Sequence, residues 1–287
     1  MKISTEIGSI AKHVGECKAV ELCAKAGFDG WDFSMFAMAK FNWQTWSCDP
    51  TDHPLGGSNY LRFARELRHI GEECGIRCNQ SHAPFPVECR DIRNLLPRAL
   101  ECTAEAGGEI CVIHPDNNKS AEENAEMYLE LLEIAKGYGV KIATENMWNW
   151  DSTIDYSTFA ACSTSESFCR HLEIVHDDDF VACLDIGHAE MQGSGSGAVA
   201  MIHALGSKLQ ALHLHDNDRR WDWHQIPFAR DIDFPPIIRA LKETGYGGWF
   251  TLEADKYLMD YDESTVLQGV KNMAAATARL ARMYEEI

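Results

Sequence analysis

The chain repeats one pattern about eight times: a short apolar stretch typical of a β-strand, then a longer amphipathic stretch typical of a helix. Several short stretches are apolar at nearly every position, such as Ile110–Ile113 (ICVI) and Phe180–Leu184 (FVACL). Continuous apolarity is typical of parallel strands that are buried on both faces. Such regular alternation leaves two architectures, a closed eight-stranded barrel or an open doubly wound sheet.

We expect helices at Asn59–Cys74, Ala121–Tyr138 and Ile232–Thr244, among others. The expected strands are Lys2–Gly8, Gly30–Ser34, Ile76–His82, Glu109–His114, Val140–Asn146, Phe180–Asp185, Leu209–His215 and Trp249–Ala254. No GxGxxG motif follows the first strand, which disfavours the dinucleotide-binding form of the open sheet. Eight units favour the barrel, so we predict a single (β/α)₈ TIM-barrel domain over residues 1–287.

Charge, apolar runs and cysteine content indicate which classes of protein and which compartment to expect. Lys and Arg number 26 against 44 Asp and Glu, a net charge of −18, which disfavours binding to a nucleic-acid backbone. No apolar run is long enough to cross a membrane, and the N-terminal segment has no signal-peptide core, so we expect a cytoplasmic protein. The 11 cysteines are scattered through apolar segments, which is typical of buried thiols in a reducing compartment.

Metal-capable side chains end nearly every strand from the third onward. They are His82, His114, Glu145, Asp185 with His188, His213 with His215, and Glu253. In a barrel, the C-terminal ends of the strands meet at one mouth, where barrel enzymes build their active sites. A carboxylate directly behind apolar strand residues needs a metal or a cationic partner, since an unpaired one is costly to bury. Taken singly, each residue has an ordinary reading too: a hydrogen-bonded histidine, a helix-capping aspartate or a glutamate paired with an arginine.

Together these side chains predict a divalent-metal site. Carboxylate and imidazole ligands without a thiolate suit Mn²⁺, Co²⁺, Mg²⁺ or Zn²⁺. Two carboxylates beside such a metal can abstract a proton next to a polarised carbonyl and return it elsewhere. This is the equipment of an aldose–ketose isomerase or a ketose epimerase.

The sequence resembles the xylose isomerase-like barrels, which include sugar isomerases and epimerases and also endonuclease IV. The resemblance covers nearly the whole chain. It rests on the motifs SHAPF (Ser81–Phe85), VIHP (Val112–Pro115), ATEN (Ala143–Asn146), CLDIGH (Cys183–His188), ALHLHDND (Ala211–Asp218), Asp222-Trp-His224, DIDF (Asp231–Phe234) and TLEA (Thr251–Ala254). The motifs are specific for the superfamily and much less so for one activity.

In the epimerase branch one metal is held by residues that match Glu145, Asp185, His213 and Glu253. The resemblance implies that the two glutamates transfer the proton through a metal-stabilised enediolate. It also implies that His188 and Arg219 hold substrate oxygens. We place His82 and His114 with them as substrate-binding residues.

The endonuclease branch carries three zinc ions and offers the first alternative, a zinc-dependent phosphodiesterase acting on abasic DNA. The additional metal ligands would then be His82, His114, His188, Asp222 and His224, and all are present. The charge of −18 and the lack of basic, aromatic-laced loops oppose it. The segment before DIDF also reads IPFAR where relatives have a glycine-rich stretch, which leaves the shape of this loop open. The second alternative is a barrel subunit of a hetero-oligomeric glycoside-cleaving enzyme.

Tryptophans are concentrated in segments expected near the mouth, at Trp31, Trp43, Trp46, Trp148, Trp150, Trp221 and Trp223. Aromatic walls suit the flat C–H faces of sugars, although we expect about half of these side chains to pack between loops or subunits. No convincing phosphate-binding loop is present. We therefore expect a metal-dependent isomerase or epimerase of a small, unphosphorylated sugar, with no membrane or nucleic-acid partner. Relatives are often dimers or tetramers, so the resemblance also implies a homo-oligomer.

Overall fold

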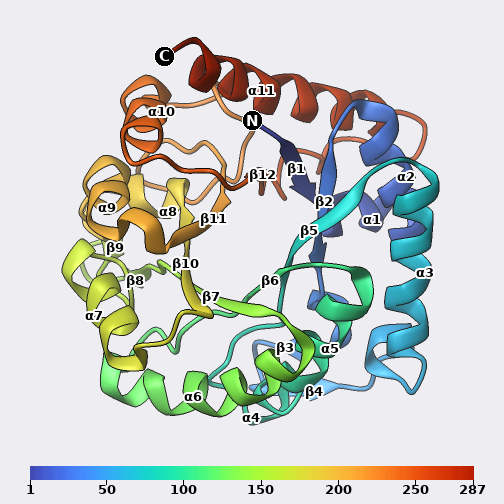
Figure 1. Cartoon of the computed structure of the whole chain (residues 1–287), viewed down its shortest axis with the longest axis horizontal. Helices are drawn as coiled ribbons and strands as arrows, with labels where there is room; N and C mark the ends of the chain where they lie inside the picture. The colour runs from blue at the N-terminus through green and yellow to red at the C-terminus, as the bar shows by residue number, and fades with distance from the viewer.

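Eight parallel strands form one sheet in the computed structural model, which describes residues 1–287 (Figure 1). The strand order is β11-β10-β7-β6-β5-β2-β1-β12. The two ends of this order meet where Leu214 pairs with Leu252, and the Glu253 amide donates to the Leu214 carbonyl oxygen at 2.9 Å. The sheet thus closes on itself, which confirms the predicted (β/α)₈ barrel.

Each barrel strand lies within the range predicted from the sequence. The strands are β1 (Ile3–Glu6), β2 (Gly30–Ser34), β5 (Arg77–His82), β6 (Ile110–Val112), β7 (Lys141–Glu145), β10 (Phe180–Asp185), β11 (Leu209–His213) and β12 (Phe250–Leu252). Strand β2 contains Trp31, which is fully buried and lies near Gly71 of the helix outside it. The prediction that Trp31 lies near the mouth is therefore wrong, because it is a core residue between strand and helix.

Helices surround the sheet, as Figure 1 shows. They are α1 (Gly8–Val14), α2 (Glu16–Ala26), α3 (Tyr60–Glu73), α4 (Arg90–Arg93), α5 (Leu96–Ala106), α6 (Ala121–Tyr138), α7 (Ser165–Val175), α8 (Ile186–Glu190), α9 (Ala198–Leu205), α10 (Phe234–Glu243) and α11 (Val266–Glu286). Helix α6 shows why the local sequence folds this way. Ser120 and Glu123 form a capping box at its start, and Gly139 ends it at a φ of 68°. No helix has the length and apolarity that a membrane crossing needs.

Two hairpins follow the C-terminal ends of β2 and β7 and were not predicted. The first consists of β3 (Lys40–Asn42) and β4 (Ser47–Asp49), and the second of β8 (Asn149–Asp151) and β9 (Tyr156–Thr158). Short 3₁₀ turns occur at Phe36–Met38, Pro54–Gly56 and Gly206–Lys208. Because they follow C-terminal strand ends, both hairpins carry their tryptophans to the mouth of the barrel.

The buried apolar residues form two clusters that locate the site. The larger one, of 67 residues, includes the packing between sheet and helices. The smaller one has five residues, Val112, Ala143, Val181, Cys183 and Ala211. Alternate residues of a strand share a face. Ala143, Cys183 and Ala211 each stand two positions before a predicted ligand, so those ligands point into the barrel as well.

Candidate metal centre

One set of polar side chains meets at the ends of β5, β6, β7, β11 and β12. We call this set the Glu145 group; its members are His82, His114, Glu145, His213 and Glu253. His213 Nδ1 lies 2.7 Å from Glu145 Oε1 and 3.5 Å from Glu253 Oε2. On its other side, Glu145 Oε2 lies 3.2 Å from His114 Nε2 and 3.5 Å from His82 Nε2. Glu145 therefore sits between the pair of histidines and His213.

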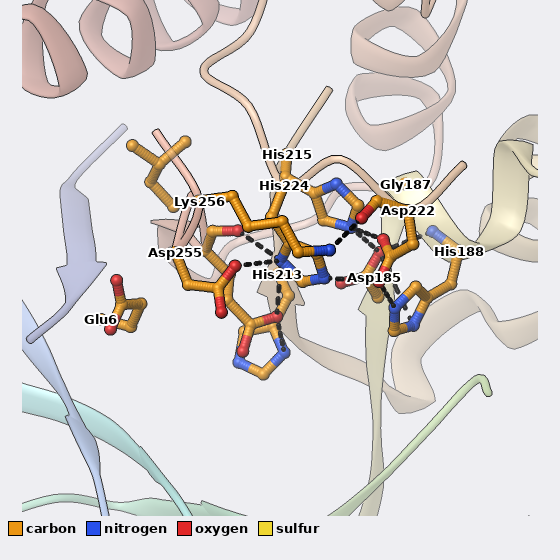
Figure 2. A network of polar contacts seen from close by, with 12 residues as sticks. Glu6, Asp185, Gly187, His188, His213, His215, Asp222, His224, Asp255 and Lys256 are labelled. Carbon is orange, nitrogen blue, oxygen red and sulfur yellow. Dashed lines mark hydrogen bonds and ion pairs between the residues drawn. The ribbon is translucent and has the colours of Figure 1, made fainter. Parts of the chain in front are cut away.

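A second set lies beside it, at the end of β10 and in the loop after β11 (Figure 2). We call it the Asp222 group; its members are Asp185, His188, His215, Asp222 and His224. Asp222 Oδ2 lies 2.9 Å from His224 Nε2 and 3.6 Å from His188 Nε2, and Asp222 Oδ1 lies 3.5 Å from His215 Nε2. Asp185 Oδ1 lies 3.0 Å from His215 Nε2. The four predicted primary ligands are thus divided, with Asp185 turned toward the Asp222 group.

Backbone carbonyl oxygens orient three of these imidazoles. The Nδ1 atom of His82 donates to Ala83 at 2.8 Å, that of His188 to Asn146 at 3.0 Å, and that of His224 to Glu253 at 2.8 Å. With Nδ1 bound in this way, each Nε2 atom faces the neighbouring polar side chains. This is the arrangement of a metal-binding histidine whose second nitrogen is hydrogen-bonded to a fixed acceptor.

Several buried polar atoms at the mouth form no hydrogen bond of regular geometry, although some of them lie near another polar side chain. They are Glu145 Oε2, Asp185 Oδ2, Asp222 Oδ1, Asp255 Oδ1, Asp32 Oδ1 and both ring nitrogens of His215. A buried polar atom without a partner is costly and in native proteins calls for an explanation, such as an ion. Carboxylate and imidazole atoms within coordination reach of each other are the donor set of a divalent cation. The residues therefore fit the predicted metal.

The two glutamates have opposite protonation tendencies. Burial and the neighbouring Glu145 carboxylate raise the pKa of Glu253 to about 8, against the attraction of His213. Burial alone would raise the pKa of Glu145 too, but His213, His114 and His82 outweigh it and hold that pKa well below its usual range. Two carboxylates whose environments separate their pKa values are suited to the roles of acid and base.

Electrostatics also separate the histidines. Burial lowers the pKa of His114 to about 4, so this ring is neutral at pH 7. Burial would also lower the pKa of His188, but Asp185 and Asp222 outweigh it and raise that pKa to about 9. Without a cation, the Asp222 group is therefore held together by a protonated histidine. A divalent cation that binds to this group can replace that proton.

Sequence reasoning missed Asp32 as a site residue. It is buried within β2, and its Oδ2 atom accepts from Gln80 Nε2 at 2.9 Å and from His213 Nε2 at 3.3 Å. This contact leaves His213 Nδ1 turned to Glu145 and Glu253. Asp32 does not end a strand and stands between apolar residues in WDFS, so only its charge inside a strand could have identified it.

His215 was noted at a strand end but assigned no role. Its ring stacks on His224 with centroids 3.9 Å apart and planes 10° apart. The space that the ring occupies exists because residue 187 is a glycine. A Cβ at that position would lie 1.9 Å from His215 Cε1. The DIGH motif therefore has two roles. Asp185 caps the helix by accepting from the His188 amide at 2.7 Å, and Gly187 leaves space for the His215 ring.

Members of both groups line one pocket of about 450 Å³ at the mouth, whereas Asp185, His213 and His215 lie behind its lining. Trp43, Trp46, Trp148 and Lys256 also line it, and Lys256 donates to the backbone carbonyl oxygen of Asp222. Arg219 does not line the pocket. Its Nη2 atom lies 3.5 Å from Glu190 Oε2, and its side chain is partly exposed. The structure therefore does not bring this predicted substrate-binding residue to the others. A larger surface hollow of about 700 Å³ lies at α6, α7 and α9, away from the metal-capable groups.

Other tryptophans have a packing role. Trp150 stacks on Trp221 with centroids 4.4 Å apart, which joins the β8–β9 hairpin to the loop after β11. Trp223 donates from Nε1 to Asp218 Oδ2 at 2.7 Å within that loop. None of these three lines the pocket.

Comparisons with known proteins agree with this architecture. The chain is 30% identical to an uncharacterized protein of Methanocaldococcus jannaschii, in a match that covers 77% of this chain and 78% of that protein. It is 25% identical to an inosose dehydratase of Serratia proteamaculans, over 46% of this chain and 47% of that enzyme.

Two solved structures have the same fold. A D-tagatose 3-epimerase-like protein superposes with a TM-score of 0.72 at 20% identity, covering 100% of this chain and 99% of that one. An IOLI protein with a bound zinc atom also gives 0.72, at 19% identity, covering 99% of each chain. The family model described as xylose isomerase-like TIM barrel matches residues 20–280. This chain belongs to the xylose isomerase-like TIM barrel family.

Proposed function

We propose that the protein is a divalent-metal-dependent sugar isomerase or epimerase that moves a proton with Glu145 and Glu253. The observation that carries the proposal is the placement of these two carboxylates. Both lie within 3.5 Å of His213 Nδ1 at the buried end of a pocket, with pKa values shifted in opposite directions. The similarity to an epimerase-like structure and to an inosose dehydratase supports a sugar or polyol as substrate.

The proposed metal ligands are Glu145, Asp185, His213 and Glu253, and the Asp185 carboxylate would turn from His215 toward the Glu145 group to bind it. When bound, a divalent cation supplies a Lewis acid that polarises a substrate carbonyl. The carboxylate of Glu145, anionic through its histidine neighbours, takes the proton from the carbon next to that carbonyl. Glu145 passes that proton to solvent, and Glu253, deprotonated when the metal is bound, takes a proton from solvent and delivers it to the other face or to the neighbouring carbon. His82, His114 and His188 line the same pocket, and their ring nitrogens are placed to bind sugar hydroxyls.

The experiment that tests this proposal is proton exchange with solvent. The purified protein, loaded with Mn²⁺ or Co²⁺, is incubated with a panel of ketoses in deuterated water. We expect deuterium at the carbon next to the carbonyl, detected by NMR, for at least one ketose. Absence of exchange across the panel by protein that demonstrably holds metal contradicts the proposal.

A zinc-dependent phosphodiesterase remains the second candidate because the structure assembles the additional ligands that it requires. His188, Asp222 and His224 are close enough to hold a cation of their own, separate from the Glu145 group. The chain's net charge of −18 opposes a DNA substrate. Elemental analysis separates the two: about one Mn²⁺, Co²⁺ or Mg²⁺ per chain supports the isomerase, whereas two or three Zn²⁺ ions support the phosphodiesterase.

Metal affinity is expected to fall as the pH falls. Metal ligands must be deprotonated, and the pKa of Glu253 is raised to about 8 in the metal-free protein. One proton must leave this carboxyl below that pH, so affinity falls by about tenfold per pH unit. Calorimetric titration with Mn²⁺ from pH 8 down to pH 6 measures the slope. An affinity that is constant over this range contradicts Glu253 as a ligand.

The contact between Asp32 and His213 predicts a role for Asp32 in positioning. We expect Asp32→Asn to weaken metal binding by about 10–100-fold, because outer partners of ligating histidines orient them and raise their basicity. The metal-free protein is expected to keep most of its thermal stability, since asparagine retains an oxygen that can accept from Gln80 and His213. Titration and thermal unfolding together test this. A lower melting temperature with unchanged metal affinity would assign Asp32 a purely structural role.

A further inference from the structure

The pocket at the mouth has a second end, built from aromatic side chains. At its buried end lie Glu145, His188 and Glu253, whereas its rim includes Trp43 and Trp46 of the β3–β4 hairpin. These two tryptophans are 62% and 55% exposed although they line a pocket. Its volume, about 450 Å³, is within the range of sites for drug-sized ligands and exceeds what one hexose fills.

An aromatic wall connects the two ends. Phe85 packs on His114 with centroids 4.8 Å apart, and Phe36 packs on both Phe85 and His82, at 5.0 and 4.8 Å. Phe36, Phe85 and both hairpin tryptophans line the pocket. The pocket therefore presents ring surfaces both beside the metal-capable residues and at its rim.

The hairpin holds its two tryptophans in place. Both pack edge-on against Phe41, with centroids 4.9 Å away for Trp43 and 5.6 Å for Trp46. Trp46 has a φ of 52°, a left-handed conformation that is rare for a bulky residue. The Trp46 carbonyl oxygen accepts from the Cys89 thiol at 3.8 Å, which ties the hairpin to the loop before α4. Backbone strain of this kind is concentrated at ligand-binding sites in proteins.

We propose that the substrate has two rings: a sugar unit that carries the carbonyl and reaches the Glu145 group, and a second ring joined to it that stacks on Trp43 and Trp46. This inference rests on the proposed function and names its substrate class. Exposed tryptophans offer a flat apolar face, which a second sugar ring or an aromatic aglycone can cover. The buried, carboxylate-rich end accepts only the polyhydroxylated ring.

The test compares binding of three probes to the metal-loaded protein by calorimetry: D-glucose, cellobiose and phenyl β-D-glucoside. We expect cellobiose, phenyl glucoside or both to bind about tenfold more tightly than glucose, because ring stacking adds to the contacts of the first sugar. A gain for cellobiose alone identifies a second sugar, and a gain for phenyl glucoside alone identifies an aromatic aglycone. The double variant Trp43→Ala/Trp46→Ala is expected to lose the preference.

Phe159→Ala is the matched control. Phe159 follows β9, is 64% exposed and does not line the pocket, so its variant keeps the preference. Equal affinities for the three probes overturn the inference, as does a preference that survives the double variant. The inference is also overturned if the double variant has a different oligomeric state in solution from the wild type. The tryptophans would then belong to a contact between copies of the chain. Deuterium exchange into a simple ketose is unaffected by these outcomes and tests the proposed function separately.

Discussion

Glu145→Gln and Glu253→Gln should each lower proton exchange between substrate and solvent by about 10²–10⁴-fold, the range that a positioned acid or base contributes. Glutamine has nearly the shape of glutamate but cannot take or return a proton. Glu145 makes contacts to His82, His114 and His213, so its replacement also removes the charge that holds these rings together. Deuterium incorporation followed by NMR, with metal content measured on the same samples, gives both effects.

Glu88→Gln provides the control for these variants. Glu88 lines the same pocket but is exposed and forms no hydrogen bond or ion pair with either group. Its variant has the same change in net charge and should retain exchange within about twofold, as expected of a surface substitution. Exchange that persists in both Glu145→Gln and Glu253→Gln at full metal content excludes the two-glutamate mechanism.

Gly187→Ala should both destabilise the protein and weaken metal binding. The added Cβ would lie within 2.4 Å of three atoms of the His215 ring, which is fully buried and stacked on His224. Overpacking of this kind costs about 1–3 kcal/mol. Asp185 begins the turn that contains Gly187, so its carboxylate shifts with the backbone. We expect metal affinity to fall by at least about tenfold, as for other losses of ligand support.

Gly137→Ala is the matched control for this substitution. Gly137 lies in α6, is exposed, and a Cβ there meets no atom within 4 Å. The free energy of unfolding of this variant should rise by about 0.5–1 kcal/mol, because alanine is the better helix former. Urea unfolding of both variants without metal, followed by calorimetric titration, separates the effects. Wild-type metal affinity in Gly187→Ala would show that His215 and Asp185 do not depend on the space at residue 187.

The fold could be predicted from the sequence because the apolar runs, the amphipathic repeats and the helix-capping residues all indicate the same elements. Short apolar runs such as Phe180–Leu184 favour buried strands, and the amphipathic repeat of Ala121–Tyr138 follows a capping box that begins at Ser120. The ends of the strands were predictable for the same reason. A carboxylate or imidazole that follows an apolar run points to the mouth, as Glu145 and His213 do.

The rest of the site could not be predicted, because it depends on contacts between distant segments. Asp32 stands inside a strand, and its partner His213 is 181 residues away. The division of the ligands into two groups follows from the turn of Asp185 toward His215, which no local pattern encodes. Arg219 matches the family motif, yet its side chain lies beside Glu190, a contact that no local pattern indicates.

The hydrogen bonds that orient His82, His188 and His224 all end on main-chain oxygens. A peptide carbonyl persists whatever side chain its residue carries. Substitutions at neighbouring positions such as Ala83 can therefore accumulate during evolution while the imidazoles keep their direction. In such a scaffold the side chains that line the pocket can be substituted, and the substrate can change with them. The imidazoles keep their orientation throughout. The scaffold's capacity to acquire new specificities resides in the backbone, while the side chains around the rim remain free to vary.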